Sequence, residues 1–306
     1  MKGKRIRGMI AANITPVNGK GEFDAGMVKP MVDLLIDRGT EAFFAIGSTG
    51  NFPLFSTGER KSVAVAMVKA VNGRVPLCIQ VGSDTESQTL ELAGHAGETG
   101  ADCIAAVPPY YFKYDAAALT AYFARIAAVN PELPFYVYNI PMYAANDVAP
   151  ALLKSMREKI PNLCGVKDTT QDFTRFIDYV DVMGKDFDNL MGSDAMCVGA
   201  IITGGAGGIC AMAAHNPELM SAVFKLTREK RLEEAQHLQF LASRLRLLFM
   251  KLPFFTPRAA IIRKRGIIDT YHRMPMRVLT ADEDRLLFNT LADLEQEFDF
   301  PLLAKV

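Results

Sequence analysis

The position with the clearest chemical potential is Lys167, which directly follows the largely apolar run at residues 163–166. Burial disfavours the charged ammonium, so a lysine at the edge of a buried run has a lowered pKa and a free amine that can attack a carbonyl carbon. Tyr138 ends a second apolar run, and its phenol can carry a proton to and from a substrate hydroxyl. The pair predicts imine (Schiff-base) chemistry. Two structural roles stay open: an ion pair between Lys167 and Asp168, and an ordinary hydrogen bond from Tyr138.

A second chemical feature is the segment Gly47, Ser48, Thr49 and Gly50. Two hydroxyls stand between glycines that let a ligand approach the backbone N–H groups, and this combination can cradle a carboxylate. The segment lacks the Gly-Lys pair of the phosphate-binding loop of nucleoside triphosphatases. A plain turn has the same composition, so both interpretations remain open from these residues alone.

Metal ligands do not occur at a characteristic spacing. The four histidines are His95, His215, His237 and His272, and no two of them form a metal-binding motif. The five cysteines form no C-x-x-C pair and mostly lie in apolar runs, where reduced cysteine packs as a small hydrophobic residue. We therefore expect no metal site and a cytoplasmic protein without disulfides.

The overall charge argues against polyanionic partners. Lys plus Arg and Asp plus Glu both number 34 among 306 residues, so the formal net charge is zero, and 50% of the residues are hydrophobic. Nucleic acid and anionic lipid are not expected partners, because no global positive field attracts them. No apolar stretch approaches the roughly 18 residues that span a membrane. The basic start at residues 1–8 leads into a strand-like segment, so we expect no signal peptide.

These reactive residues need a framework, and short β-rich runs alternating with longer helical stretches predict one. Eight strands are predicted, at residues 6–14, 42–47, 75–81, 103–107, 134–140, 163–167, 189–192 and 207–211. Helices are predicted between them at residues 24–38, 56–71, 85–99, 115–129, 149–158, 171–183 and 194–203. Eight β/α units predict an α/β fold of the closed (β/α)8 (TIM barrel) type. No G-x-G-x-x-G motif follows the first strand, which disfavours a Rossmann fold.

After about residue 215 the alternation gives way to helices alone. They are predicted at residues 217–227, 231–250, 256–264 and 281–298. We therefore divide the chain into a catalytic barrel, residues 1–225, and a C-terminal helical extension, residues 226–306. The extension would cover the barrel or form a subunit contact.

Reactive groups of such barrels lie at the carboxyl ends of the strands. The expected site residues all follow or end predicted strands, which brings them to one mouth. Beside those already named, this set contains Gly192, Ser193 and Asp194 after the seventh strand and Ile209 on the eighth.

Three motifs in this order resemble the class I pyruvate-dependent aldolase family, which contains dihydrodipicolinate synthase and N-acetylneuraminate lyase. They are G-S-T-G at residues 47–50, Y-N-I-P at residues 138–141 and G-V-K-D-T at residues 165–169. The resemblance covers essentially the whole chain and implies the same barrel fold.

The resemblance also implies roles for individual residues. Lys167 would form the imine with pyruvate or another 2-oxo acid, Tyr138 would shuttle protons, and Ser48 with Thr49 would hold the carboxylate. No cofactor beyond this covalent imine is implied. Tyr111 matches a tyrosine that family members lend across a subunit interface, which implies a dimer, usually within a homotetramer.

The second substrate is where the chain departs from its best-known relatives. Dihydrodipicolinate synthases carry a carboxylate-binding arginine where this chain has Tyr143, and an acidic residue where it has Asn51. Without that arginine, a bidentate grip on a second carboxylate is lost, which favours a neutral aldehyde. Sialic acid lyases share Asp194, but Ala195 and Ala211 replace two of their sugar-binding residues.

Local similarity is greatest to the 2-keto-3-deoxy sugar-acid aldolases, through K-D-T at residues 167–169 and G-S-D at residues 192–194. We therefore expect a lyase that reversibly cleaves such a 2-oxo acid to pyruvate and a small aldehyde. Dihydrodipicolinate synthase-type condensation, N-acetylneuraminate lyase activity and sugar-acid dehydration remain alternatives. Aromatic residues near the mouth, among them Phe52, Tyr110 and Tyr143, keep a hydratase-aldolase for aromatic aldehydes open. A non-catalytic barrel that binds a 2-oxo acid is the alternative outside imine chemistry.

Overall fold

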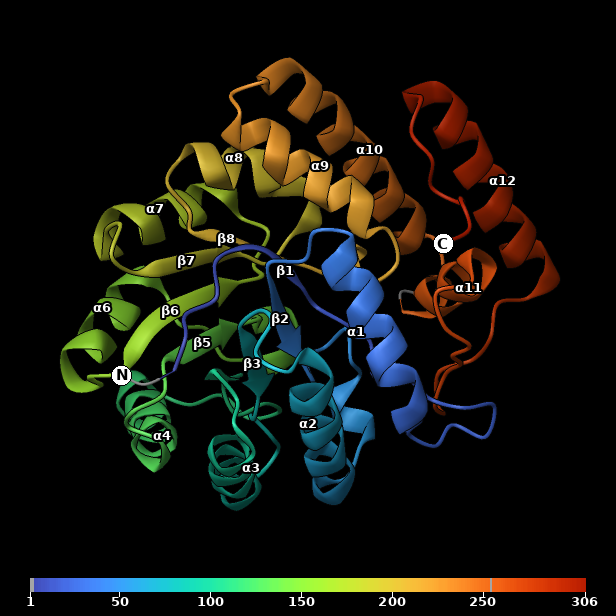
Figure 1. Cartoon of the computed structure of the whole chain (residues 1–306). Coiled ribbons are helices and arrows are strands. Elements are labelled where there is room, and N and C mark those ends of the chain that lie inside the picture. The colour runs from blue at the N-terminus through green and yellow to red at the C-terminus, as the bar shows by residue number, and fades with distance from the viewer. Residues whose placement is uncertain (1–2, 254) are drawn as a thin grey trace.

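A closed parallel barrel forms the centre of the computed structural model, which describes residues 3–253 and 255–306 (Figure 1). The strands are β1 (Gly8–Ala11), β2 (Ala42–Ala45), β3 (Leu77–Gln80), β4 (Cys103–Ala106), β5 (Phe135–Asn139), β6 (Leu163–Asp168), β7 (Asp188–Met191) and β8 (Gly207–Cys210). They pair in chain order, and β8 closes on β1 with Ile209 opposite Ile10. The predicted (β/α)8 barrel is confirmed, and the eight predicted strands differ from the observed ones only at their ends.

Helices surround the barrel in Figure 1 and cover the outer face of its strands, whose inner face is filled by their own side chains. All strand residues are buried. They are α1 (Val28–Asp37), α2 (Thr57–Val71), α3 (Glu86–Thr99), α4 (Ala116–Val129), α6 (Pro150–Lys159), α7 (Phe173–Met183) and α8 (Cys197–Ile202). Ser56 and Glu59 form a capping box at the start of α2, because each side chain accepts a hydrogen bond from the other residue's backbone N–H.

Two predicted helices begin differently from expectation. Residues 25–27 form the 3-10 helix η1 before α1, and Asp24 caps η1 instead of the α-helix. Residues 194–196 likewise form the 3-10 helix η3 before α8. The sequence pattern also missed α5 (Pro141–Ala144), a short helix that begins at a proline. Proline suits a first helical position because the N–H that it lacks would have no partner there.

The helices that follow β8 lie on one side of the molecule (Figure 1). They are α9 (Pro217–Arg228), α10 (Leu232–Met250), α11 (Thr256–Arg265) and α12 (Ala281–Phe298). Helix α10 packs against α9, α12 and η3. Its contact with η3 places a C-terminal helix beside the loop that follows β7. The division at residues 225 and 226 falls inside α9 and stays a prediction.

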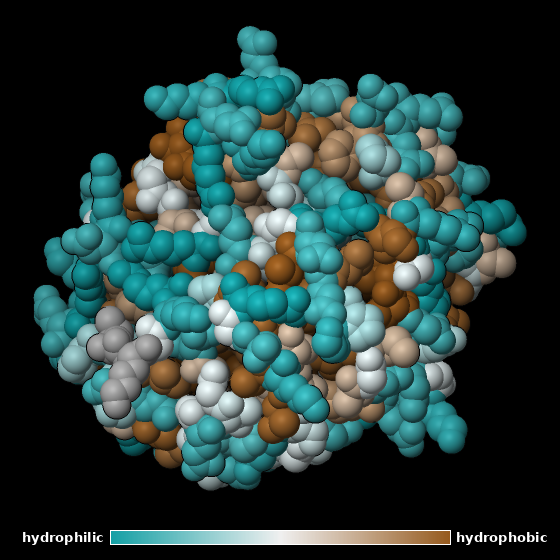
Figure 2. All heavy atoms as spheres, viewed as in Figure 1, coloured by the Kyte–Doolittle hydropathy of each residue, from teal (hydrophilic) through white to brown (hydrophobic). Residues whose placement is uncertain are grey.

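The surface mixes polar and apolar side chains. Figure 2 shows hydrophilic residues spread over the face in view, with smaller hydrophobic patches between them. In the described part of the chain, no helix is long and apolar enough to cross a lipid bilayer. All five cysteines are buried free thiols. Residues 3–253 and 255–306 contain no cluster of three or more His, Cys, Asp or Glu side chains arranged to hold a metal ion.

Candidate active site

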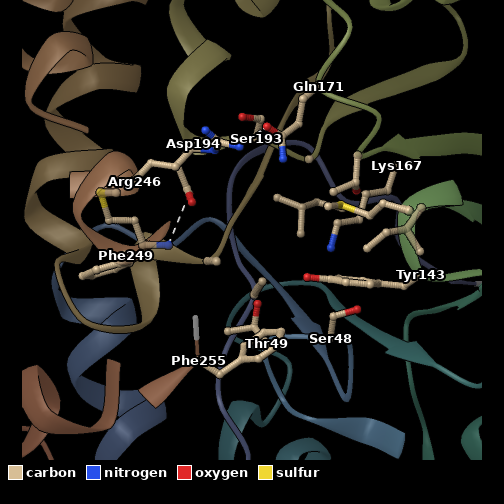
Figure 3. Close-up of a pocket in the computed structure, with 18 of the residues that line it drawn as sticks. Ser48, Thr49, Tyr143, Lys167, Gln171, Ser193, Asp194, Arg246, Phe249 and Phe255 are labelled. Atoms are coloured by element: carbon tan, nitrogen blue, oxygen red, sulfur yellow. Dashed lines mark hydrogen bonds between the residues drawn. The ribbon is translucent and has the colours of Figure 1, made fainter. Parts of the chain in front are cut away.

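A cavity of about 300 Å³ lies at the carboxyl ends of the strands. It brings together most of the residues that the sequence nominated. Those that line it are Ser48, Thr49, Tyr138, Tyr143, Lys167, Gly192, Ser193, Asp194 and Ile209. Figure 3 shows Lys167 and Tyr143 on one side of this cavity and Asp194 and Arg246 on the other.

Lys167, near the end of β6, is only 4% exposed. Its Nζ atom lies 4.0 Å from the centre of the Tyr138 ring and 4.3 Å from that of Phe44. Burial lowers the pKa of Lys167 to about 7, while the negative charge of Asp194 acts in the opposite direction. A large share of the amine is therefore neutral at pH 7, which a nucleophilic lysine requires.

The ion pair considered for Lys167 and Asp168 is absent from the described residues. Successive strand residues point to opposite faces, so these two side chains diverge. Asp168 accepts a hydrogen bond of 2.7 Å from the Thr170 hydroxyl, and burial raises the pKa of its carboxyl. Lys167 therefore faces the cavity without the carboxylate beside it in the sequence.

Tyr138 pairs directly with Lys167 in the β5–β6 register. Its phenol oxygen lies 3.0 Å from Oγ of Ser48, close enough for a hydrogen bond in either direction. Burial raises the pKa of Tyr138 to about 12, and the hydroxyls of Ser48 and Thr169 oppose this rise. The phenol is therefore protonated at neutral pH and connected to a second hydroxyl, which suits a group that relays protons.

The loop after β2 forms one rim of the cavity. The backbone N–H of Asn51 donates to the carbonyl of Ser48 over 3.0 Å, and Asn51 adopts a left-handed conformation with φ of 56°. This tight turn presents Ser48 and Thr49 to the cavity. Gly47 and Gly50, which we expected to contact substrate, do not line it. A Cβ atom on Gly47 would lie 3.0 Å from the Phe44 ring, so this glycine permits close packing behind the turn.

The loop after β7 forms the opposite rim. A Cβ atom on Gly192 would approach the carbonyl oxygen of Asp168 to 2.6 Å, so only glycine fits this crossing. The next residue, Ser193, has a buried hydroxyl without a hydrogen-bond partner among the described residues. Asp194 accepts a 3.2 Å hydrogen bond from the backbone N–H of Met212, and burial raises the pKa of its carboxyl.

Tyr111 lies apart from the cavity of its own chain. It is 84% exposed, has a positive φ of 83°, and packs edge-on against Phe112 with the ring centres 5.0 Å apart. Asn146 fixes this loop by donating to the carbonyls of Pro109 and Phe112, each over 2.6 Å. The loop is thus held with an aromatic side chain projecting into solvent.

The sequence interpretation missed the cavity residues supplied by the C-terminal part of the chain. They are Arg246, Phe249, Met250, Phe255 and Arg258. No local signal singled out Arg258, because helix α11 carries three further basic residues, Arg263, Lys264 and Arg265. The sequence argument for a neutral second substrate considered only the position of Tyr143, where no arginine stands. Arg246 and Arg258 supply positive charge to the cavity from other positions.

Comparisons with known proteins agree with the geometry. Residues 5–294 match the dihydrodipicolinate synthetase family. A DapA-like lyase of Halobacterium salinarum is 30% identical over 289 residues, 94% of each chain. A 4-hydroxy-tetrahydrodipicolinate synthase of Brucella abortus is 31% identical over 277 residues, covering 90% of this chain and 94% of that one.

The solved structures agree as well. The prophage protein YagE of E. coli K12, whose crystal structure contains pyruvate, superposes with a TM-score of 0.91 at 27% identity, over 94% of this chain and 98% of that one. The family match spans nearly the whole barrel together with the C-terminal helices. The chain belongs to the dihydrodipicolinate synthetase family, whose members are pyruvate-dependent lyases and synthases.

Proposed function

We propose that this protein reversibly cleaves a 2-oxo acid of the 2-keto-3-deoxy sugar-acid class to pyruvate and an aldehyde, through an imine on Lys167. The observation that carries the proposal is the buried Lys167 amine, whose pKa of about 7 leaves it partly neutral beside Tyr138. Pyruvate bound to the related YagE supports the choice of 2-oxo acid. The covalent intermediate replaces one difficult step by two easier ones.

The reaction follows from the three polar groups at this end of the cavity. The Lys167 amine attacks the C2 carbonyl, and the hydroxyl formed there leaves as water after taking the proton of Tyr138. The resulting tyrosinate lies near the positive iminium, which offsets its high pKa. It takes the proton of the C4 hydroxyl while the C3–C4 bond breaks, giving the aldehyde and a neutral enamine. Tyr138 then protonates C3, which restores the iminium. Water adds to C2 and returns a proton to the tyrosinate, and pyruvate leaves as the neutral Lys167 amine is restored.

Ser48 has two roles in this scheme. Its hydroxyl contacts Tyr138 and also lines the cavity beside Thr49, where both can donate hydrogen bonds to the substrate carboxylate. This fixes the 2-oxo acid with C2 toward Lys167. Condensation of pyruvate with an aldehyde is the same sequence in reverse.

A second candidate function is favoured by a separate apolar pocket. It has a volume of about 290 Å³, adjoins the first cavity through Ser48, Ile140, Tyr143 and Phe255, and includes Phe52 and Tyr110. An aromatic aldehyde would fit this lining better than a polyhydroxylated one. A hydratase-aldolase using the same imine is therefore the alternative.

We also propose that Tyr111 completes the site of a neighbouring subunit in a homotetramer built from dimers. This proposal is supported by the exposure of Tyr111 together with that of Phe112, which is 65% exposed. Exposed aromatic residues that lie together commonly mark protein interfaces.

Reductive trapping tests the proposed function. Borohydride added in the presence of pyruvate should give a stable adduct whose mass maps to Lys167, and the Lys167→Met variant should give none. As a matched control, the exposed Lys185→Met variant should be trapped like the wild type. Unmodified wild-type protein at saturating pyruvate would contradict imine chemistry and would favour a non-catalytic binding barrel.

A further inference from the structure

The cavity has a second polar end that the imine steps do not use. Figure 3 shows Asp194 and Arg246 across the cavity from Lys167. Arg258 and His215 line the same cavity. We call Ser193, Asp194, His215, Arg246 and Arg258 the distal cluster.

Arg258 is a buried cation held in place by aromatic rings. Only 4% of it is exposed, and its guanidinium carbon lies 5.3 Å from the centre of the Phe249 ring and 5.6 Å from that of Phe255. Burial lowers the pKa of Arg258 to about 10, so it remains charged at neutral pH. Burying a charge is costly unless an opposite charge compensates it.

Arg246 brings a second positive charge from helix α10. Its Nη2 atom donates a hydrogen bond to Oε1 of Gln171, and both residues line the cavity. This contact fixes the guanidinium at the cavity wall without neutralising it, because the Gln171 amide carries no charge.

Asp194 is the single acidic residue among the described residues that line the cavity. It is well anchored: its side chain accepts from the backbone N–H of Met212, and its carbonyl accepts from Nε2 of Gln239 over 2.8 Å. It interacts electrostatically with Lys167, Arg246 and Arg258. Among the described residues that line the cavity, this carboxylate lies with two arginines, which leaves one positive charge in excess. The iminium on Lys167 does not change this balance, since the carboxylate of the 2-oxo acid offsets it.

Two further groups of the distal cluster are poised to contact a substrate. The Ser193 hydroxyl and Nε2 of His215 are buried without hydrogen-bond partners among the described residues. His215 is neutral, because burial lowers its pKa to about 3, and its Nδ1 lies 2.8 Å from the Asn216 side-chain oxygen. An oxygen acceptor there places the proton on Nδ1, so Nε2 carries a lone pair that no described donor satisfies. A substrate hydroxyl would satisfy it.

We infer that the substrate is a hydroxylated 2-oxo dicarboxylate, whose second carboxylate binds Arg246 and Arg258 while its hydroxyls face Ser193, Asp194 and His215. This inference rests on the proposed imine function and narrows its substrate class. Cleavage then yields pyruvate and an aldehyde that carries a carboxylate. A carboxylate supplies the one negative charge that the cluster lacks, and its planar oxygens match guanidinium donors. A phosphate monoester would bring nearly two negative charges.

The experiment compares condensation of pyruvate with three aldehydes: glyceraldehyde, tartronate semialdehyde and glyceraldehyde 3-phosphate. The first two differ only in a terminal hydroxymethyl group against a carboxylate. We expect kcat/KM to be about 100-fold higher for tartronate semialdehyde than for glyceraldehyde, as for other charged pairs in a desolvated site. Equal values for these two aldehydes, or a preference for the phosphorylated one, would overturn the inference.

Variants of the distal cluster test whether its arginines cause the preference for the carboxylated aldehyde. Arg246→Met should lose about 100-fold in kcat/KM for tartronate semialdehyde and less than about threefold for glyceraldehyde. Arg258→Lys, which keeps the charge at a buried position, should lose about tenfold on the carboxylated aldehyde alone. The control is Arg244→Met on the same helix, an exposed arginine 3.9 Å from Glu297, which should change neither value. Equal losses on both aldehydes would contradict carboxylate recognition.

Borohydride trapping with pyruvate distinguishes failure of the imine function from failure of carboxylate recognition by the distal cluster. An adduct at Lys167 without a preference for the carboxylated aldehyde removes the distal inference and leaves the imine function intact. Absence of the adduct removes the imine function itself.

Discussion

The Nζ atom of Lys167 lies 4.0 Å from the centre of the Tyr138 ring, and the two residues are direct partners in the β5–β6 register. Neighbouring parallel strands therefore fix the proposed nucleophile and the proposed proton relay relative to each other. The same register directs both side chains into the barrel, where burial lowers the pKa of Lys167 and raises that of Tyr138.

Removing the Tyr138 hydroxyl should slow the reaction while sparing the fold. We expect Tyr138→Phe to lower kcat by about 100- to 1,000-fold, since positioned proton transfer contributes this much. Ser48→Ala should have a smaller effect, about tenfold, because the phenol remains. Steady-state kinetics measure both values, and a Tyr138→Phe variant with unchanged kcat would exclude the phenol as proton relay.

Tyr136 offers a matched control two residues earlier on β5. Its hydroxyl donates to Asp188 over 2.8 Å, and the residue does not line the cavity. Tyr136→Phe should preserve kcat but lower the free energy of unfolding by about 1–3 kcal/mol, the cost of a lost buried hydrogen bond. Chemical denaturation measures this change.

The pH dependence of kcat/KM should show the protonation of Lys167. Attack on the carbonyl needs the neutral amine, so activity should fall as the pH drops below the Lys167 pKa of about 7. Asp194 raises this pKa, so Asp194→Asn should move the acidic limb of the profile to lower pH. A limb that stays in place in this variant would contradict the electrostatic coupling.

Burial of the Lys167 amine should lower the free energy of unfolding, and replacing this lysine by an uncharged residue should raise it again. The Lys167 pKa is about 7 in the folded state, and the ordinary value of about 10.4 applies in the unfolded state. Between these values the unfolded chain binds more protons, so this lysine makes the folding stability rise with pH. Lys167→Met should be more stable than the wild type by a few kcal/mol at pH 7, and the difference should shrink toward pH 10.

Urea denaturation at several pH values measures this effect. The exposed Lys185→Met variant serves as the control and should stay within about 0.5 kcal/mol of the wild type. A Lys167→Met variant that is less stable than the wild type at pH 7 would show that packing around the lysine outweighs its desolvation.

Subunit complementation tests the role of Tyr111. Because Tyr111 is exposed in its own chain, Tyr111→Ala should leave the fold of that chain intact and yet lose activity. If the tyrosine serves a neighbouring subunit, unfolding and refolding a mixture of Tyr111→Ala and Lys167→Met chains should restore part of the activity. A hybrid dimer then contains one site with both residues intact. No recovery despite hybrid formation, shown by native mass spectrometry, would place Tyr111 outside the neighbouring site.

Much of the barrel and of the Lys167 end of its cavity is encoded locally. Alternating strands and helices predict eight β/α units, and polar residues at the strand ends predict that Ser48, Tyr138 and Lys167 converge. These inferences succeed because parallel strands joined by helices must carry their carboxyl ends to one side. The short helix α5 was missed because four residues are too few to show a helical period.

Only the tertiary structure showed which residues line the end of the cavity opposite Lys167. Arg246 and Arg258 come from helices that the sequence placed in an extension of undefined position, and no local pattern shows that α10 packs beside η3. Likewise, the sequence nominated Lys167, but its near-neutral pKa depends on long-range burial by strands and helices from across the chain. Local spacing thus indicated the candidate catalytic residues, whereas long-range packing decided their charge states and the groups that lie across the cavity from them.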